Sequence, residues 1–575
     1  MIPGINKPFV ALADATGGSI DELKLIFSFL LSYPLAAVLK RIPDRSPWIK
    51  NIFIIGVSLF YLVGLFDLWG GLRTMFIDAA ATYIIAYYID GSLMPWIGFV
   101  FLMGHMSINH IRREMLADPS TIDITGAQMV GLMKLSAFCW NVHDGRLPES
   151  ALTDSQKSRA LKEMPPLLKY TAWVMFFPSF MVGPAFDYAD YNSYIDTSMF
   201  ATAAGQPAPP TKKARKIPRS GQPATIKCLT GLAWLGAYLY LSPYYNNDAV
   251  TSPDYMDYSL IRRIFMLYAL GITTRTKYYA VWTLTEGSCI LSENVNPLQI
   301  ELAQNSRGYL EGWNKNTNHW LRNYVYLRVT PAGKKPGFLA SLMTFGTSAF
   351  WHGFAPGYYL TFILAAFVQT VAKNFRRYIR PFFLAPPKDE SDRNPNALPS
   401  KRYYDFASWF VTQIGFSFVT APFVLLTLHD SIMVWARVYF YVPVAVALSI
   451  AFFSPQLPFK KMILKKLEAR NQRPHPLTRS HSHDTLNAPT LLGLPHDPAA
   501  SIDEAISDIR SEVEARRRRG SVGASMPTGE ELKKMVESKI GQGFKIEQDK
   551  STGRIRVSVG GDSATIAGDA LKKEL

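Results

Sequence analysis

Long apolar windows recur along most of this chain and set the first expectation about its fold. A bilayer core about 30 Å thick needs roughly 20 mostly apolar residues per helix. The clearest windows of that kind lie at 23–40, 51–69, 74–89, 93–109, 168–185, 225–243, 258–274, 337–372, 404–428 and 431–454, with weaker ones at 126–142 and 277–293. The pattern predicts an all-α, polytopic transmembrane protein with about 10 to 12 membrane segments, some of them broken or re-entrant.

The composition supports this membrane interpretation against a set of soluble domains. Hydrophobic residues make up 48% of the 575 residues and charged residues only 18%, whereas soluble proteins carry about 25% charged residues. Aromatic residues reach 13%, which suits helices that end at two membrane interfaces. The lipid bilayer is therefore the first partner that the sequence implies.

The same pattern divides the chain into three parts. A short N-terminal segment (1–22) precedes the transmembrane domain (23–456), and a basic, largely disordered tail follows (457–575). The first apolar run follows acidic residues and no convincing cleavage site, so we expect a retained helix. Within the tail, Ile502–Arg516 has the pattern of an amphipathic helix and Lys545–Val559 alternates as a short hairpin does.

Basic residues predict how the chain is oriented. The net charge is +16, but lysine and arginine gather in the loop 186–223, in 373–402 and in 460–466. Two strong spans separate the last two stretches, so both can lie on the cytosolic side together with the tail. We therefore expect no nucleic acid as a partner. The terminal Lys572 and Lys573 resemble a dilysine retrieval signal, which predicts an endoplasmic-reticulum membrane protein recognised by coat proteins.

His352 is the most informative single residue. It lies in the segment SAFWHGFAPGYY, inside the apolar run 337–372, and an ionisable group at membrane depth is a functional candidate by default. A neutral imidazole accepts a proton from a hydroxyl, as a general base does. Gly353 and Pro356 predict a broken helix beside a cavity. The alternative is a histidine hydrogen-bonded between helices.

A polar and aromatic segment, WNKNTNHWLRNYVYLR, precedes His352 and is too hydrophilic to span lipid unaided. Asn314 within it is a candidate to orient a base or to donate a hydrogen bond to developing negative charge. Asn316, Asn318 and His319 are rivals for that role. An interfacial amphipathic helix without a catalytic role is the other interpretation.

Three further motifs accompany these two segments: RTKYYAVW at 275–282, DITGAQMVGLMKLSAFCWNVHDGR at 123–146 and PSFMVGPAFDYADY at 178–191. Together, the five motifs resemble those of the membrane-bound O-acyltransferase (MBOAT) family. More narrowly, they resemble its lysophospholipid acyltransferase branch, in the broad-specificity form found in fungi. The resemblance covers about 120–370, and the tail lies outside it.

The resemblance implies a fold of MBOAT type and assigns the catalytic histidine to His352 and the catalytic asparagine to Asn314. Their neighbours Trp351 and Trp313 are assigned to substrate binding. It further implies that an acyl-CoA co-substrate and a lysophospholipid (lysophosphatidylcholine, lysophosphatidylethanolamine, lysophosphatidic acid or similar) meet in one chamber, in phospholipid synthesis and remodelling. A thioester is already activated, so we expect no cofactor and no metal.

Other polar residues of the motifs are candidates for substrate binding. Arg275, Lys277, Tyr278 and Tyr279 supply the donors that a phosphate of CoA or of the lysolipid needs, although interfacial anchoring explains them nearly as well. Asp144 lies in a mostly apolar setting, where it either touches substrate or positions a helix. We favour the structural role for Asp144.

Two alternative functions remain from the sequence. A membrane transporter also combines several helices with intramembrane polar residues, but we find no inverted repeat. Within the family, the acceptor is alternatively a sterol, a diacylglycerol or a protein. The sequence lacks HxxxxD, GxSxG, Walker A and GxGxxG motifs, which disfavours soluble-type acyltransferases, esterases, ATPases and dehydrogenases.

Overall fold

Helices are the main elements of the computed structural model of this chain. The structure describes residues 4–116, 122–200, 220–289, 295–330, 338–386 and 395–471, together with three short strands of the tail. The expected helix at Ile502–Arg516, the disordered character of the tail beyond 471 and the Lys572–Lys573 signal lie outside the described residues. The boundaries of the three expected parts therefore stay a prediction.

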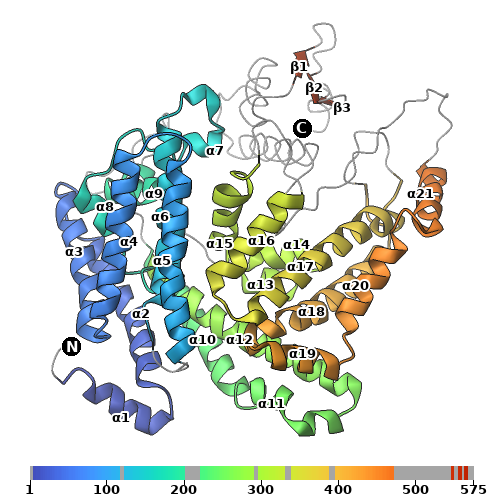
Figure 1. Cartoon of the computed structure of the whole chain (residues 1–575), viewed down its shortest axis with the longest axis horizontal. Coiled ribbons are helices and arrows are strands. Elements are labelled where there is room, and N and C mark those ends of the chain that lie inside the picture. The colour runs from blue at the N-terminus through green and yellow to red at the C-terminus, as the bar shows by residue number, and fades with distance from the viewer. Residues whose placement is uncertain are drawn as a thin grey trace.

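Residues 7–200 form one group of helices, blue to teal in Figure 1, in which α4 and α6 stand upright and α1 lies across the lower end. Its elements are α1 (Lys7–Thr16), α2 (Ile20–Leu39), α3 (Pro47–Leu59), η1 (Phe60–Leu65), α4 (Trp69–Tyr88), α5 (Met94–Leu116), α6 (Thr125–Gly145), η2 (Glu149–Ala151), α7 (Asp154–Lys157), α8 (Leu167–Val174), α9 (Tyr188–Ile195) and η3 (Ser198–Phe200). α6 borders the second half of the molecule and is buried on all sides. A helix without a polar face belongs in the core.

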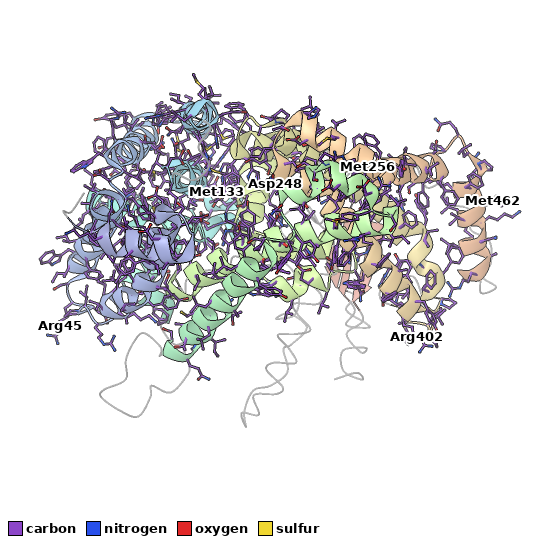
Figure 2. The ribbon with its side chains drawn as sticks, turned by 90° about the horizontal axis from the view of Figure 1, so that it is seen from below. Arg45, Met133, Asp248, Met256, Arg402 and Met462 are labelled. Atoms are coloured by element: carbon purple, nitrogen blue, oxygen red, sulfur yellow. The ribbon has the colours of Figure 1, made fainter. Side chains whose placement is uncertain are left out.

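The C-terminal half forms the second group, green to orange in Figure 1. Its elements are α10 (Gly221–Leu241), α11 (Asn247–Thr251), η4 (Pro253–Asp257), α12 (Leu260–Cys289), α13 (Pro297–Glu301), α14 (Ser306–Gly312), α15 (Lys315–Trp320), η5 (Leu321–Tyr326), α16 (Phe338–His352), α17 (Pro356–Asn374), η6 (Phe375–Ile379), η7 (Arg380–Phe383), α18 (Lys401–Leu425), α19 (Leu428–Arg437), α20 (Tyr441–Phe452) and α21 (Pro458–Asn471). Seen from below, Met133 of α6 lies well inside the outline, whereas Arg45 and Arg402 lie near opposite edges (Figure 2).

The tail holds the strands that the structure describes. β1 (Lys545–Gln548), β2 (Ile555–Val559) and β3 (Asp562–Ile566) form an antiparallel sheet in sequence order. Lys545 pairs with Ser558, and Ile555 pairs with Ile566. The hairpin expected over Lys545–Val559 is confirmed, and the transmembrane part is all-α as predicted.

Four described helices are long and apolar enough to cross a membrane, judged by length and composition. They are α2, α3 with its π-helical continuation η1, α10 and α18, and the pair α19 and α20, bent by 75°, raises the number to five if it counts as one span. The other long described helices, such as α5 and α12, do not meet that test. The number of membrane segments therefore stays a prediction.

Two expected segments differ from the structure. The windows 258–274 and 277–293 form a single helix, α12, because the charged residues that separate them are accommodated by partners on neighbouring elements. The window 168–185 is helical only to Val174. There the Lys134 ammonium donates hydrogen bonds to the carbonyls of Trp173 and Val174, so a side chain of α6 satisfies the end of α8.

The second and third basic stretches lie on the same side of the molecule, as an even number of crossings predicts. Arg470 of α21 donates to the carbonyl of Pro381 at 2.5 Å and to that of Leu384. Residues 458–471 form the helix α21, and Arg470 near its end binds it to the segment of η7.

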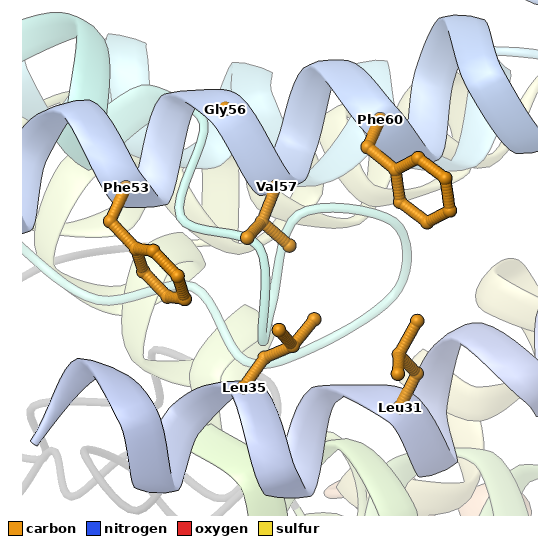
Figure 3. Close-up of a pocket in the computed structure, with 6 residues that line it drawn as sticks. All are labelled: Leu31, Leu35, Phe53, Gly56, Val57 and Phe60. Carbon is orange, nitrogen blue, oxygen red and sulfur yellow. The ribbon is translucent and has the colours of Figure 1, made fainter.

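A cavity of about 350 Å³ opens between α2 and α3 (Figure 3). Its lining consists only of apolar side chains and one glycine: Leu31, Leu35, Phe53, Gly56, Val57 and Phe60. Because this lining offers no group that accepts or donates a proton, the cavity is not where the chemistry suggested by the sequence takes place.

Candidate active site

His352 is the last residue of α16, at the break that the sequence predicts. Gly353 follows with a φ of 125°, a conformation that glycine adopts far more readily than other residues. Pro356 then opens α17, where its missing N–H costs nothing. Gly357 packs so closely on α18 that a Cβ would lie 2.0 Å from the Pro422 carbonyl. The glycine and proline residues thus build the turn that presents His352.

Aromatic rings surround the His352 imidazole. Its centroid lies 4.8 Å from that of Phe423, 5.5 Å from that of Phe362 and 5.6 Å from that of Tyr358. Within the part of the chain that the structure describes, its ring nitrogens make no hydrogen bond to protein groups. This environment does not match the alternative of a histidine hydrogen-bonded between helices. It leaves the imidazole available to a substrate hydroxyl.

Trp351 anchors the His352 segment to α6. Its indole nitrogen donates to the carbonyl of Met129 at 3.1 Å, and its ring lies 6.1 Å from that of Trp320. Trp351 is buried. In the structure this tryptophan therefore holds the backbone of the candidate base, and its assignment to substrate binding stays a prediction.

Asn314 is the N-cap of α15. Its Oδ1 accepts a hydrogen bond from the Thr317 backbone nitrogen at 3.2 Å, the usual way in which a short polar side chain satisfies a helix start. The helix then packs on α6, because the Thr317 hydroxyl donates to the Met133 sulfur at 3.4 Å and the Trp320 indole donates to the Ser136 hydroxyl at 2.9 Å. Thr317 and Trp320 are thus the buried residues of α15, whereas His319 is exposed, and the alternative of an interfacial helix stays open.

One face of α6 thus joins the two candidate residues. Met129, Met133 and Ser136 are spaced four and three residues apart, which places them on the same side of a helix. Met129 holds the residue before His352, and Met133 and Ser136 hold the helix that Asn314 caps. Segments 38 residues apart in the sequence are therefore brought to one region of the core.

Trp313 turns toward α12 and packs among the aromatic residues of the RTKYYAVW motif. Its ring centroid lies 5.0 Å from that of Trp282, 5.6 Å from that of Tyr278 and 6.1 Å from that of Tyr279. The Tyr279 hydroxyl is already engaged, since it donates to the Glu301 carboxylate at 2.8 Å. These contacts place Trp313 and the two tyrosines beside the segment that carries Asn314.

The two cations of this motif point to different partners. Arg275 is buried and donates to both oxygens of Glu301, at 2.8 and 2.9 Å. Lys277 is half exposed and lies 3.5 Å from Glu22 of α2. Residues two apart on a helix do not share a face, so these cations do not form one phosphate site together. The role of each in substrate binding stays a prediction.

Asp144 makes a buried ion pair at the end of α6. Its Oδ1 accepts from Arg328 Nη1 at 2.8 Å, and its Oδ2 accepts from Arg328 Nη2. Gln156 donates to the same carboxylate at 3.3 Å. Asp144 is 1% exposed. The bidentate pair ties α6 to the chain after η5, and this agrees with a structural role more than with substrate contact.

Sequence reasoning missed His110 of α5, which lies against the His352 turn. Its Nε2 donates to the Trp351 carbonyl at 3.2 Å. No local pattern singles it out, because it falls just past an expected span, directly after Asn109 and two residues before Arg112. Among the rivals of Asn314, His319 lies 3.0 Å from Arg159 Nη1.

Comparison with known proteins identifies the family. The model of the MBOAT, membrane-bound O-acyltransferase family matches residues 117–395. A relative from Schizosaccharomyces pombe, named "Lysophospholipid acyltransferase", is 41% identical over 484 residues, which are 81% of this chain and 92% of the relative. The chain belongs to the membrane-bound O-acyltransferase family. Asn314, His352 and the whole of α6 fall within the range that the MBOAT model matches.

Similarity extends to further members of the MBOAT family. A protein from Saccharomyces cerevisiae with the same name is 40% identical over 490 residues, covering 80% of this chain and 78% of the relative. The "Membrane-bound glycerophospholipid O-acyltransferase 2" of Rattus norvegicus is 27% identical over 494 residues, covering 80% of this chain and 90% of the relative. The resemblance deduced from the motifs is confirmed.

Proposed function

We propose that this chain is an acyl-CoA-dependent lysophospholipid acyltransferase, which transfers a fatty acyl chain to the free glycerol hydroxyl of a lysophospholipid. The observation that carries the proposal is the 41% identity, across 92% of its length, to a yeast protein named for that activity. The aromatic surroundings and free ring nitrogens of His352 support it, because a general base has to be open to the substrate.

The reaction that this site suits proceeds in one acyl-transfer step. His352 takes the proton from the glycerol hydroxyl, and the oxygen attacks the thioester carbonyl carbon. The resulting tetrahedral centre collapses by breaking the carbon–sulfur bond, and the leaving thiolate of CoA takes up the proton that His352 had accepted, which restores the neutral imidazole. Holding both substrates together supplies much of the rate enhancement.

Asn314 stabilises the negative charge that develops on the thioester oxygen. Its Oδ1 is used by the cap of α15, so the amide N–H group is the part that remains to donate. A fixed donor aimed at an oxyanion stabilises the transition state more than the ground state. We assign Trp313 and Tyr278 to the wall of the acyl chamber, because they pack beside this residue.

The distribution of lysine and arginine and the pair Lys572–Lys573 support a proposal for the membrane and the orientation of the protein. The protein resides in the endoplasmic-reticulum membrane with its tail in the cytosol, and acyl-CoA enters from that side. Coat proteins recognise Lys572 and Lys573. Replacing both lysines with alanine is expected to move a fluorescently tagged protein out of the reticulum, and unchanged location would contradict the signal.

The activity is tested on membranes from cells that express the wild type, His352→Ala or the matched control His429→Phe, whose histidine is exposed on α19. Transfer from radiolabelled oleoyl-CoA is measured with lysophosphatidylcholine, lysophosphatidylethanolamine, lysophosphatidic acid, diacylglycerol and a sterol. We expect ester formation on lysophospholipids with the wild type and the control, and a loss of more than 100-fold with His352→Ala.

Each other outcome overturns a distinct part of the proposal. Wild-type membranes that match empty membranes on every lysophospholipid contradict the function. Transfer only to diacylglycerol or sterol reassigns the acceptor within the family. Full activity of His352→Ala, with protein levels equal to those of the wild type, removes His352 from catalysis.

A further inference from the structure

His110 occupies the position between α5 and the turn that carries His352. The residue is 7% exposed. Its Nε2 donates to the Trp351 carbonyl at 3.2 Å. That carbonyl belongs to the last turn of α16, where four carbonyls lose their helical partners, so the imidazole of one helix satisfies the broken end of another.

The residue after His352 is shaped to this contact. A Cβ on Gly353 would lie 3.1 Å from Nδ1 of His110, and the φ of 125° at Gly353 disfavours other residues independently. The His110 ring also meets that of Phe354 edge-on, at 6.4 Å between centroids. Residues 351, 353 and 354 therefore all contact His110, while the intervening His352 points into its own aromatic cluster.

A buried polar network fixes α5 and α6 at the same level. The side-chain amide of Asn109 donates to Oε1 of Gln128 at 2.6 Å. The side-chain nitrogen of Gln128 in turn donates to the Asp78 carboxylate of α4 at 2.9 Å. Asp78 in turn lies 2.6 Å from Nδ1 of His105, one turn earlier on α5. Such bonds in a core of low dielectric constant strengthen one another and specify one arrangement of the helices.

This network lies directly beside the contacts that hold the His352 turn. Asn109 precedes His110, which binds the Trp351 carbonyl, and Gln128 precedes Met129, whose carbonyl binds the Trp351 indole. The hydrogen bond between Asn109 and Gln128 thus sets the distance between the two groups that bind Trp351. The His110 imidazole binds its backbone carbonyl, and the Met129 carbonyl binds its indole nitrogen.

We propose that His110 is a positioning residue for acyl transfer, which holds the Trp351–Gly353 backbone through its Nε2–H group and thereby aims the His352 ring at the acceptor hydroxyl. The inference rests on the proposed function for the identity of the reaction. The hydrogen-bonded clamp around the turn is independent of the substrate, and it supplies a measurement that does not depend on activity.

Three variants separate the hydrogen bond from the shape of the ring. His110→Gln places its amide nitrogen the same number of bonds from Cβ as Nε2 and keeps the donor. His110→Asn is one bond shorter, and His110→Phe keeps a ring without a donor. His429→Phe serves as the control for the loss of a histidine at an exposed site.

Kinetics provide the first measurement. His110→Phe and His110→Asn are expected to lower kcat by 10- to 100-fold with KM for both substrates within twofold of the wild type, because a misplaced base affects the transition state alone. His110→Gln is expected to keep kcat within about threefold. Equal loss in all three variants, or a rise in KM without a fall in kcat, overturns the positioning role.

Hydrogen exchange of the purified protein provides the second measurement. The Gly353 nitrogen donates to the carbonyls of Ala349 and Phe350 at 3.2 and 3.1 Å, so a held turn protects this amide. Peptides over 349–358 are expected to exchange at least fivefold faster in His110→Phe and at the wild-type rate in His110→Gln and His429→Phe.

The two measurements distinguish the possible failures. Unchanged exchange in His110→Phe refutes the clamp, whatever the activity of the protein. Faster exchange in a protein whose wild type transfers no acyl chain upholds the clamp as a structural contact and refutes its role in acyl transfer, together with the proposed function. Faster exchange with an unchanged kcat refutes the positioning role alone.

Discussion

The side-chain oxygen of Asn314 accepts a hydrogen bond from the backbone nitrogen of Thr317 at 3.2 Å. The bond fixes the orientation of the amide at the start of α15, because only one end of the group satisfies the helix. The oxygen of this side chain therefore caps a helix, while its nitrogen is a donor that makes no hydrogen bond within the part of the chain that the structure describes. The two duties are separable by substitution.

Asn314→Asp and Asn314→Ser both retain a capping oxygen and lose the amide donor. We expect each to fold with a thermal midpoint near that of the wild type and to lose about 10²- to 10³-fold in kcat, the usual cost of one oxyanion donor. Asn314→Ala is expected to lose the cap as well, about 1 kcal/mol. Wild-type turnover in the serine variant would contradict a catalytic role for this residue.

Arg275 and Glu301 distinguish an ion pair from a phosphate site. Arg275→Gln and Glu301→Gln are each expected to lower the thermal midpoint, because each leaves a largely buried charge without its partner at a cost of about 3 kcal/mol. A phosphate-binding Arg275 predicts a different result, a higher KM in Arg275→Gln alone. Thermal denaturation and kinetics of both variants, with Lys162→Gln, which breaks an exposed pair with Glu149, as the control, decide between them.

Asp144 is expected to contribute to stability through Arg328. Asp144→Ala removes a bidentate partner from a cation that is only 13% exposed and is expected to destabilise the protein by about 3 kcal/mol. The double variant with Arg328→Ala should recover part of this loss, as coupled neighbours do. Asp90→Ala, which breaks an exposed pair with Arg146, should have little effect. A selective rise in KM with unchanged stability would instead support substrate contact.

Gly357 and Gly346 form a matched pair of helical glycines on α17 and α16. A Cβ at Gly357 would lie 2.0 Å from the Pro422 carbonyl, whereas one at Gly346 meets nothing within 4 Å. Gly357→Ala is therefore expected to displace α18 and to reduce both folded yield and acyl transfer. Gly346→Ala should leave both unchanged or add about 0.5 to 1 kcal/mol of stability. Size-exclusion profiles and activity test the pair, and equal behaviour would refute the close contact.

The break at His352 was predictable because its causes are local. Gly353, Pro356 and Gly357 each restrict or permit backbone conformations on their own, and they occur within five residues. The cap by Asn314 is equally local in its chemistry. As a candidate catalytic residue, Asn314 was not distinguished from Asn316, Asn318 and His319 by the sequence pattern, and the family resemblance made that assignment.

The contacts that assemble the site were not predictable from one sequence. Trp351 and Met129 are 222 residues apart, and His110 and Trp351 are 241 apart, so no periodicity relates them. The same limit explains the two wrong segments. In the sequence, Arg275 and Lys277 interrupt an apolar run, and only the structure shows that Glu301 and Glu22 pair with them. Likewise, α8 ends where Lys134, 39 residues before Trp173, donates a hydrogen bond to the carbonyl of that residue.

The burial of the Arg275–Glu301 pair determines how it responds to salt. Arg275 lies at the midpoint of α12, a helix of 30 residues, and its side chain is only 5% exposed beside Glu301. Dissolved ions screen exposed charges strongly and buried pairs much less. Raising the salt concentration should therefore weaken an exposed pair such as Lys162–Glu149 more than this one, so that α13 stays attached to α12 over a wide range of ionic strength.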